Sequence, residues 1–175
     1  MAKRQSLREF QQDLTRRLTE VKASGRRSAL LAVNAGPENW LLDLSEAGEI
    51  IVTPNLTPVP LTREWFRGLA NVRGNLYSVV DFAAFCGEGI TPMNSNTRIL
   101  LIGAKHGMNT ALLVSRALGL RNPEDFDTDE TTIDQRPWVA GAVRDSQDRL
   151  WRKLNVRPLL ADAHFLDATL DSYAT

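Results

Sequence analysis

Apolar and polar positions alternate in short blocks along most of the chain after residue 28, and this pattern predicts a mostly β protein. Each block has about the length of a strand, and Gly, Pro, Asn or Asp separates most of the blocks. No long helical spacing interrupts the series, which favours a barrel or sandwich architecture. The nine predicted strands are 29–33, 40–44, 49–53, 68–72, 76–82, 98–102, 110–118, 138–143 and 150–156.

The clearest local signal is a β-hairpin. Residues 67–73 and 76–82 carry strand-like patterns, and only Gly74 and Asn75 stand between them. A two-residue connection that begins with Gly suits a type II′ turn, because Gly readily takes the positive φ of the first central position. We therefore expect the turn at Gly74 and Asn75.

Helical periodicity is confined to the two ends of the chain. An N-terminal apolar stripe with intervals of 3, 4, 4 and 3 residues predicts an amphipathic helix over 6–24, which Ser6 can cap and Gly25 can end. Pro158 favours the first turn of a closing helix, predicted over 158–171. The apolar positions of the first helix are Leu7, Phe10, Leu14, Leu18 and Val21, and those of the second are Leu159, Ala163, Leu166 and Leu170.

The N-terminal segment is strongly basic. Residues 1–30 hold eight basic and three acidic residues, a net charge of +5. Three interpretations are open: the helix packs on its own domain with a solvated basic face, it docks on a partner, or it lies on a membrane surface, which the modest stripe favours least. On this pattern the chain divides into a helical extension, 1–27, and a main domain, 28–175.

An acidic stretch interrupts the strand series between residues 122 and 136. It has little apolar content, and its charge pattern predicts an exposed loop. Such a loop is either simply solvated or a contact surface, for a basic partner or for the basic N-terminus of the same chain. Its acidic residues are Glu124, Asp125, Asp127, Asp129, Glu130 and Asp134, against the single basic residue Arg136.

Composition narrows the class of protein further. The 175 residues suit one domain or two small subdomains with a shared core. Basic and acidic residues number 21 each, and the resulting zero net charge disfavours a general nucleic-acid binder. A single cysteine, Cys86, excludes an internal disulfide and a cysteine-based zinc site. No apolar run approaches the ~20 residues of a membrane span, and the N-terminus lacks a secretory pattern, so we expect a soluble cytoplasmic protein.

The sequence contains no catalytic or cofactor-binding motif. His164 lies near Asp162 and Asp167, but no Gly-x-Ser-x-Gly motif accompanies them, and we expect a surface histidine. No phosphate-binding glycine loop is present. Cys86 is expected to be buried and inert, because the nearby Glu88 would raise its pKa. We therefore expect binding without a cofactor or a metal; a small β-barrel enzyme and a nucleic-acid binder that uses the basic helix are the alternatives.

Residues 65–82 carry a motif that resembles the signature of CheW-like domains. The family pattern has Gly-x-x-Asn-Leu-Arg-Gly, then a strand that ends in Val-Ile-Asp-Leu, then a short helix that ends in Phe-Gly. Glu49-Ile50-Ile51 resembles the family's glutamate strand, and Ser78 stands where the family usually has proline. The resemblance covers about residues 28–171 and is strongest to PilI-type members, which serve type IV pilus chemosensory systems. The matching residues are Gly68, Asn71, Val72, Arg73, Gly74, Val79, Val80, Asp81, Phe82, Phe85, Cys86 and Gly87.

The resemblance implies two intertwined five-stranded SH3-like barrels and a function without catalysis or cofactor. CheW-like proteins couple methyl-accepting chemoreceptors to the regulatory domain of a CheA-type histidine kinase. The resemblance thus implies a cytoplasmic adaptor recruited to membrane-associated receptor arrays, here for twitching motility, with no nucleic-acid partner and no membrane insertion. A flagellar or other chemosensory pathway, or an unrelated small β-barrel binding protein, is the alternative.

Part of the motif has a structural role on physical grounds. Gly74 supplies the turn, and Gly68 allows two backbones to approach closely. Asn71 is expected to bind local backbone groups, and Asp81 to cap the short helix that follows it. The predicted structural residues of the motif are Gly68, Gly74, Asp81, Phe82 and Gly87.

Arg73 is the residue best suited to bind a partner. Beside a turn, its guanidinium can form bidentate hydrogen bonds with a partner's carboxylate or helix C-terminus. The resemblance implies that Arg73 lies on the receptor side. The alternative is an internal salt bridge that holds the two barrels together. Apolar residues beside it either line a groove for a receptor helix or belong to the core. The predicted receptor-side set is Arg73, Leu69, Val72, Asn71 and Leu76.

Overall fold

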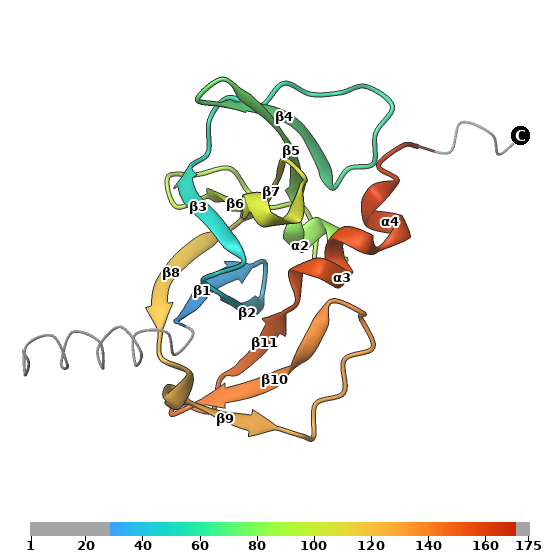
Figure 1. Cartoon of the computed structure of the whole chain (residues 1–175). Coiled ribbons are helices and arrows are strands. Elements are labelled where there is room, and N and C mark those ends of the chain that lie inside the picture. The colour runs from blue at the N-terminus through green and yellow to red at the C-terminus, as the bar shows by residue number, and fades with distance from the viewer. Residues whose placement is uncertain (1–28, 171–175) are drawn as a thin grey trace, which may run out of the picture.

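Two β-sheets are the main secondary structure of the described chain (Figure 1). The computed structural model describes residues 29–170. The six-stranded sheet has the order β8-β1-β2-β11-β10-β9, with β1 (Leu30–Ala35), β2 (Glu38–Asp43), β8 (Arg116–Arg121), β9 (Phe126–Asp129), β10 (Val139–Asp145) and β11 (Leu150–Leu154). The five-stranded sheet has the order β3-β6-β7-β5-β4, with β3 (Ala47–Val52), β4 (Phe66–Val72), β5 (Asn75–Asp81), β6 (Arg98–Ile102) and β7 (Thr110–Val114).

The two sheets share one plan. In each, the second strand of a hairpin, β2 or β5, pairs in parallel with a later strand, β11 or β7. Two further antiparallel strands continue each sheet, β10 and β9 in one and β6 and β3 in the other. The larger sheet has β8 in addition, which pairs with β1.

The mostly β fold predicted from the sequence is confirmed, with two corrections. Residues 110–118 form two strands instead of one, because the chain passes from one sheet to the other at Ser115, whose backbone N–H donates to the carbonyl of Asn34 at 2.8 Å. The expected pair of five-stranded barrels is also modified. The strands form sheets of six and five, because β8 joins the edge beside β1 and gives one sheet a sixth strand.

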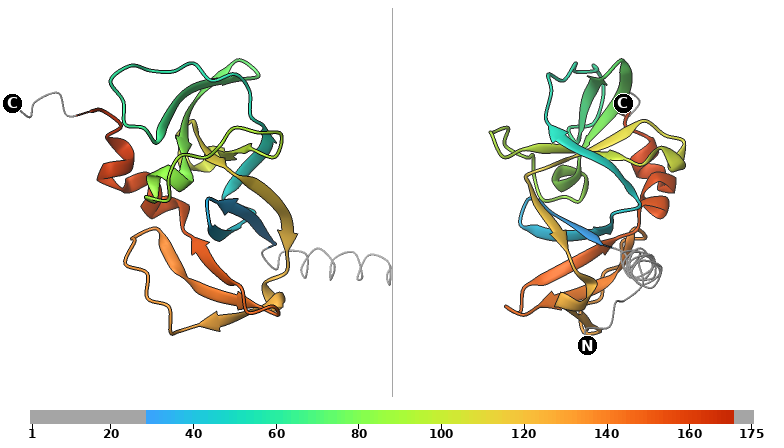
Figure 2. Two further views of the ribbon diagram at one scale, coloured as in Figure 1. Left: turned by 180° about the vertical axis from the view of Figure 1, so that it is seen from behind. Right: turned by 60° about the vertical axis from the view of Figure 1, so that its left-hand side comes forward.

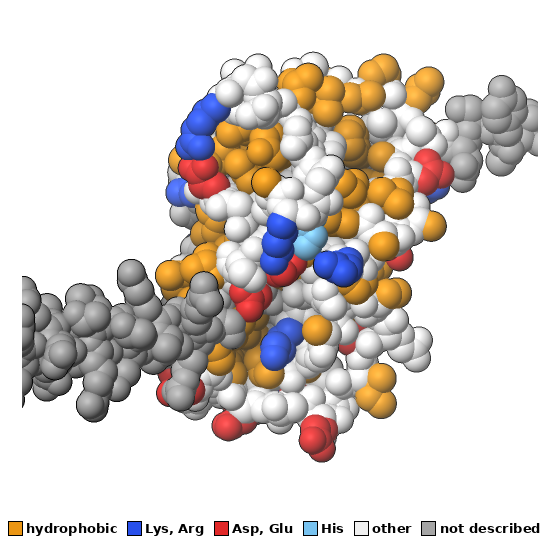
Figure 3. Space-filling model, viewed as in Figure 1, with side chains coloured by type: hydrophobic (Ala, Val, Ile, Leu, Met, Phe, Trp, Pro, Cys, Tyr) orange, Lys and Arg blue, Asp and Glu red, His pale blue; other side chains and the backbone are white. Residues whose placement is uncertain are grey.

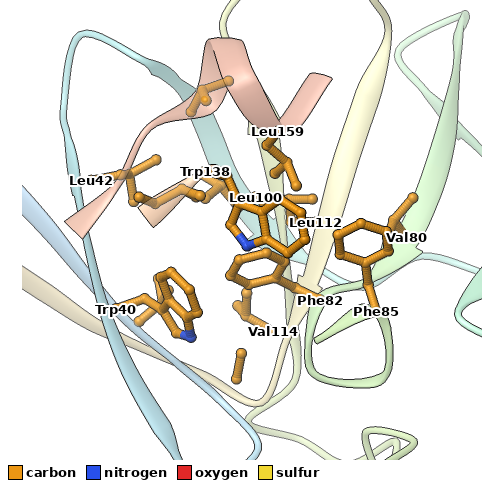
Figure 4. Packing of buried hydrophobic residues seen from close by; sticks show 14 of the residues in the cluster. Trp40, Leu42, Val80, Phe82, Phe85, Leu100, Leu112, Val114, Trp138 and Leu159 are labelled. Carbon is orange, nitrogen blue, oxygen red and sulfur yellow. The ribbon is translucent and has the colours of Figure 1, made fainter. Parts of the chain in front are cut away.

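One large core joins the two sheets. Trp40 and Leu42 of the six-stranded sheet belong to the same buried cluster as Leu100 and Leu112 of the five-stranded sheet (Figure 4). The ring of Phe82 is 4.8 Å from that of Trp40. Burial of a side chain of this size is worth about 1.5–3 kcal/mol. This cluster is therefore the main apolar contact that fixes the sheets relative to each other.

In the described part of the chain, short α-helices lie together at one side of the molecule, where the sheets meet (Figures 1 and 2). They are α2 (Phe82–Phe85), α3 (Val156–Ala161) and α4 (Ala163–Leu166). Two short 3₁₀ turns, η1 (Ala104–His106) and η2 (Pro123–Asp125), follow β6 and β8. The short helix expected after Asp81 is confirmed as α2.

The closing helix predicted over 158–171 is wrong in extent. The backbone is extended at Asp162, where the side chain accepts hydrogen bonds from the N–H groups of His164 and Phe165 and starts α4. Asp162 thus acts as an N-cap in the middle of the predicted helix. Of the predicted apolar stripe, Leu159 is buried, whereas Leu166 and Leu170 are exposed.

The acidic stretch 122–136 is only partly the exposed loop that the sequence predicts. Asp129 lies in β9 and accepts from Arg144 Nε at 2.9 Å, and Asp134 accepts from Arg136 and Arg152. Both carboxylates are nearly buried, at 4% and 10% exposure. These two residues therefore belong to the fold, and the exposed acidic residues are Glu124, Asp125, Asp127 and Glu130.

The predicted N-terminal helix, with Leu7, Phe10, Leu14 and Leu18, lies outside the described residues. The division into an extension, 1–27, and a main domain, 28–175, therefore stays a prediction. Within residues 29–170, no helix has the length and apolar content needed to cross a membrane.

Candidate protein-docking site at the β4–β5 turn

The turn between β4 and β5 consists of Arg73 and Gly74. Val72 pairs with Asn75, so only these two residues lie between the strands. Both have positive φ, 53° for Arg73 and 87° for Gly74, as in a type I′ turn. The predicted type II′ turn at Gly74 and Asn75 is therefore wrong by one residue. Asn75 belongs to β5, and Arg73 occupies the first turn position.

A side-chain hydrogen bond supports the unusual backbone conformation of Arg73. Asn71 Oδ1 accepts from the backbone N–H of Gly74 at 2.9 Å. This contact braces a turn whose first residue is not glycine, and such residues seldom adopt positive φ. It holds Arg73 at the tip of the hairpin, where its side chain is 72% exposed. The expectation that Asn71 binds local backbone is confirmed.

The guanidinium of Arg73 forms a two-pronged ion pair with Glu49 of β3. Nη1 donates to Oε2 and Nη2 donates to Oε1, both at 2.7 Å. Because β3 and β4 are the two edges of the five-stranded sheet, the pair spans the gap between these edges. The alternative given for Arg73, an internal salt bridge, therefore exists, but it does not join two barrels, since both partners belong to one sheet and its turn.

Backbone contacts close the same gap. Thr57, in the segment after β3, exchanges two backbone hydrogen bonds with Leu69 of β4, both 2.8 Å long. Gly68 permits this approach, because a Cβ atom there would lie 2.1 Å from the carbonyl oxygen of Thr57. The predicted role of Gly68 in a close backbone approach is confirmed. We call this contact between β4 and the segment after β3 the seam. Backbone hydrogen bonds already hold the seam, and the ion pair adds to it.

Both partners of the pair are held in their charged forms. Hydrogen bonds from Arg73 lower the pKa of Glu49, although desolvation opposes the shift, and the same bonds raise the pKa of Arg73. The Glu49 side chain is 41% exposed, so solvent screens the attraction. A partner carboxylate can therefore compete with Glu49 for the guanidinium of Arg73, and no buried contact is lost.

The apolar residues near Arg73 divide between the two faces of the hairpin. Leu76 lies opposite Asn71, and strand alternation places Leu69 on the same face. Leu76 is 59% exposed and Leu69 is half-buried. Val72 points to the other face and is buried in a second core cluster. The structure thus brings Leu69, Asn71 and Leu76 together beside Arg73 and assigns Val72 to the core. Figure 3 shows hydrophobic side chains at the surface over this sheet.

Asp81 anchors the far end of the hairpin. Its side chain is fully buried and accepts from Ala84 N–H at 3.3 Å, which caps α2 as predicted. Its two oxygens also accept from the backbone N–H and the hydroxyl of Thr91, at 2.8 and 2.7 Å. Arg67 of β4 donates to Oδ2 at 3.2 Å. One carboxylate therefore ties β4, α2 and the segment before β6 together behind the turn. Of the other predicted structural residues, Phe82 lies in the core and Gly87 has a positive φ after α2.

Cys86 and His164, the candidate residues for chemistry, pack against other parts of the fold. Burial raises the pKa of the Cys86 thiol to about 12, although Arg136 opposes this shift. Its expected inertness therefore follows from burial and not from Glu88. His164 is exposed and stacks on Phe85, which confirms the predicted surface histidine. In the described part of the chain, no group of three His, Cys, Asp or Glu side chains is arranged to hold a metal ion.

Glu49 is the site residue that sequence reasoning does not assign. Its only signal is its place in the glutamate strand motif, ahead of Ile50 and Ile51. The pairing with Arg73, 24 residues away, depends on the curl of the sheet that brings its edges together. A local pattern does not encode that curl.

The fold agrees with comparisons to known proteins. Residues 29–164 match the model of the CheW-like domain, and the chain belongs to the CheW-like family. Within that family it is similar to the protein PilI of Pseudomonas aeruginosa, with 25% identity over 140 residues, 77% of this chain and 76% of that protein. It also resembles the crystal structure of the scaffolding protein TtCheW from Thermoanaerobacter tengcongensis. The TM-score is 0.65 at 18% identity, over 79% of this chain and 95% of that chain. The resemblance to PilI-type CheW-like proteins is thus confirmed.

Proposed function

We propose that this protein is a non-enzymatic adaptor that couples chemoreceptors to a CheA-type histidine kinase and serves type IV pilus twitching motility. The observation that carries the proposal is the CheW-like domain over residues 29–164. The similarity to PilI favours the pilus system over a flagellar one. The proposal includes a cytoplasmic location at membrane-associated receptor arrays.

The β4–β5 turn is the surface that we assign to the receptor. A receptor tip offers helices, and a helix binds through apolar side chains on one face with polar groups beside them. Leu69 and Leu76 supply exposed or half-buried apolar surface, and Arg73 supplies a forked donor for a carboxylate or a helix C-terminus. Glu49 orients that donor before the partner arrives.

The coupling mechanism is geometric. Signalling contacts of this kind are often small, so each contact is expected to be weak alone. When one protein holds receptor and kinase together, the second contact becomes intramolecular and the assembly gains avidity. The adaptor therefore needs no chemistry of its own.

The test is a binding titration of the full chain against a receptor cytoplasmic tip and a CheA-type kinase regulatory domain. Each partner is titrated alone and both together, at 50 and 300 mM salt. We expect binding to both, tighter in the ternary mixture, with salt weakening the receptor contact. Binding to neither partner would overturn the proposal.

A matched pair of variants locates the receptor contact. Arg73→Glu should weaken receptor binding about tenfold or more, as for an interface arginine. Arg116→Glu, which changes an exposed arginine of β8, should leave receptor binding unchanged. Equal loss in both variants would show a nonspecific charge effect and contradict the assignment to the turn.

A further inference from the structure

The corner of the six-stranded sheet where the described chain begins has an uncovered apolar margin. The carbonyl of Ala29 accepts a hydrogen bond from Leu44 N–H at 2.9 Å. On the other side of β1, Leu120 of β8 lies opposite Leu31. Leu44 and Leu120 are 42% and 56% exposed. The point where residues 1–28 join the fold therefore lies between two exposed leucines.

These leucines are an extension of the main core. Residues opposite each other in a sheet share a face, so Leu120 and Leu42 flank Leu31 on one face. Leu31 and Leu42 are buried in the core between the sheets. Leu44 follows Leu42 by two residues and continues the same row. Leu44 and Leu120 thus form the rim of the core, where the apolar row reaches solvent.

An acidic strip adjoins this rim. Leu30 pairs with Arg121 at the end of β8, and η2 begins two residues later. Glu124, Asp125 and Asp127 follow there and are exposed. We call Leu44, Leu120 and these three acidic residues the N-terminal corner.

The segment that joins this corner has matching chemistry. Residues 1–28 carry eight basic and three acidic residues, whereas residues 29–175 carry thirteen basic and eighteen acidic residues. The neutral chain is thus a +5 segment attached to a −5 domain. The helix predicted over 6–24 would be about 28 Å long. The four residues 25–28 between that helix and Ala29 keep its C-terminal end within about 18 Å of Ala29.

We propose that the N-terminal segment docks in cis on the N-terminal corner. Its apolar stripe, which includes Leu14 and Leu18, covers Leu44 and Leu120, and its basic face lies along the acidic strip. The short tether supports this, because it gives the two surfaces a millimolar effective concentration, at which a weak contact is filled. The corner belongs to the six-stranded sheet, so docking there leaves the β4–β5 turn of the other sheet open.

Thiol labelling of the full chain tests the proposal. Leu120→Cys places a reporter under the docked segment, while Cys86 gives a low background because burial raises its pKa to about 12. Leu14→Gln with Leu18→Gln removes the stripe but keeps good helix formers, and it leaves the described fold untouched. The matched reporter Leu61→Cys lies at another exposed leucine, 72% exposed.

We expect the Leu120→Cys thiol to react at least tenfold more slowly in the full chain than in the Leu14→Gln/Leu18→Gln background. The Leu61→Cys thiol should react equally in both. Protection at position 120 should be independent of protein concentration and should decrease at 500 mM salt. Equal rates at position 120 in both backgrounds would overturn the proposal, and so would protection that appears only at high protein concentration, which would mean docking between copies. Receptor binding should be the same in both backgrounds, so this test and that of the adaptor function fail independently.

Discussion

Arg73 and Glu49 form a bidentate ion pair across the two edges of one five-stranded sheet, with both side chains substantially in solvent. Exposed ion pairs of this kind contribute little to stability. The backbone contact between Thr57 and Leu69 already holds the same seam. The main effect of the pair is therefore to fix the direction of a guanidinium at the tip of a turn.

A charge-swap cycle separates orientation from stability. Glu49→Arg and Arg73→Glu should each weaken receptor binding, while the melting temperature stays close to that of the wild type. The double variant restores an ion pair with reversed polarity, so the melting temperature should again match the wild type. Receptor binding should stay about tenfold weaker, because the partner now meets a carboxylate. Recovery of binding in the double variant would contradict a direct contact of Arg73.

Gly68→Ala should open the seam. Its Cβ would lie 2.1 Å from the Thr57 carbonyl oxygen, and the φ of 112° is unfavourable for alanine. We expect a loss of about 3 kcal/mol in urea unfolding, because the backbone must move. Gly74→Ala is the matched control, with positive φ but open space around the added methyl, and should cost about 1 kcal/mol. Similar losses in both variants would contradict a steric role of Gly68.

Asp81→Asn should be strongly destabilising although it keeps the shape of the side chain. If the amide nitrogen replaces Oδ2, it turns a donor toward both Thr91 N–H and Arg67. In the other orientation it replaces Oδ1 and turns a donor toward Ala84 N–H and the Thr91 hydroxyl, and the cap of α2 is lost. Breaking a buried charge contact of this kind costs about 3 kcal/mol. The control is Asp148→Asn, whose carboxylate is 86% exposed. A loss in Asp81→Asn no larger than in the control would contradict the role of Asp81 as an anchor.

Asp145 should give the protein an acid-sensitive stability. Burial works against it, but hydrogen bonds from Trp151 Nε1 and Arg149 lower its pKa to about 2 in the folded protein. The unfolded carboxyl has a pKa of about 3.9, so the unfolded chain binds the proton first as the pH falls. The melting temperature should therefore be insensitive to this group above about pH 5 and decrease as the pH falls from 4 to 2. Asp145→Asn should make this decrease shallower, whereas Glu88→Gln, at an exposed site, should not.

The sequence predicts the features that depend on near neighbours. Strand-length apolar blocks, the cap at Asp81 and the close approach at Gly68 all depend on a few consecutive residues or on glycine chemistry. The turn position was not predictable in the same way. Gly74 can serve either turn register, and the choice depends on the pairing of Val72 with Asn75 and on the hydrogen bond from Gly74 to Asn71.

Features that depend on distant partners have no local signal in the sequence. β9 consists largely of acidic and polar residues, and its pairing with β10 and the ion pair of Asp129 with Arg144 become visible only in three dimensions. The continuous apolar pattern over 110–118 hides the crossing between sheets at Ser115. The role of Glu49 has no local signal for the same reason, since its partner Arg73 is 24 residues away.

The strands of the five-stranded sheet lie in the sequence between β2 and β8 of the six-stranded sheet, and this sets an order for folding on the ribosome. All strands of the five-stranded sheet come from residues 47–114, so this sheet is complete in the nascent chain while β9, β10 and β11 are still to be made. The β1–β2 hairpin is made first, but Trp40 finds its parallel partner, Arg152, only 112 residues later. Pairings of such long range form slowly. The newly made β1–β2 hairpin must therefore pack its apolar face against the growing five-stranded sheet. A chain truncated before β11 should leave the six-stranded sheet incomplete and aggregate.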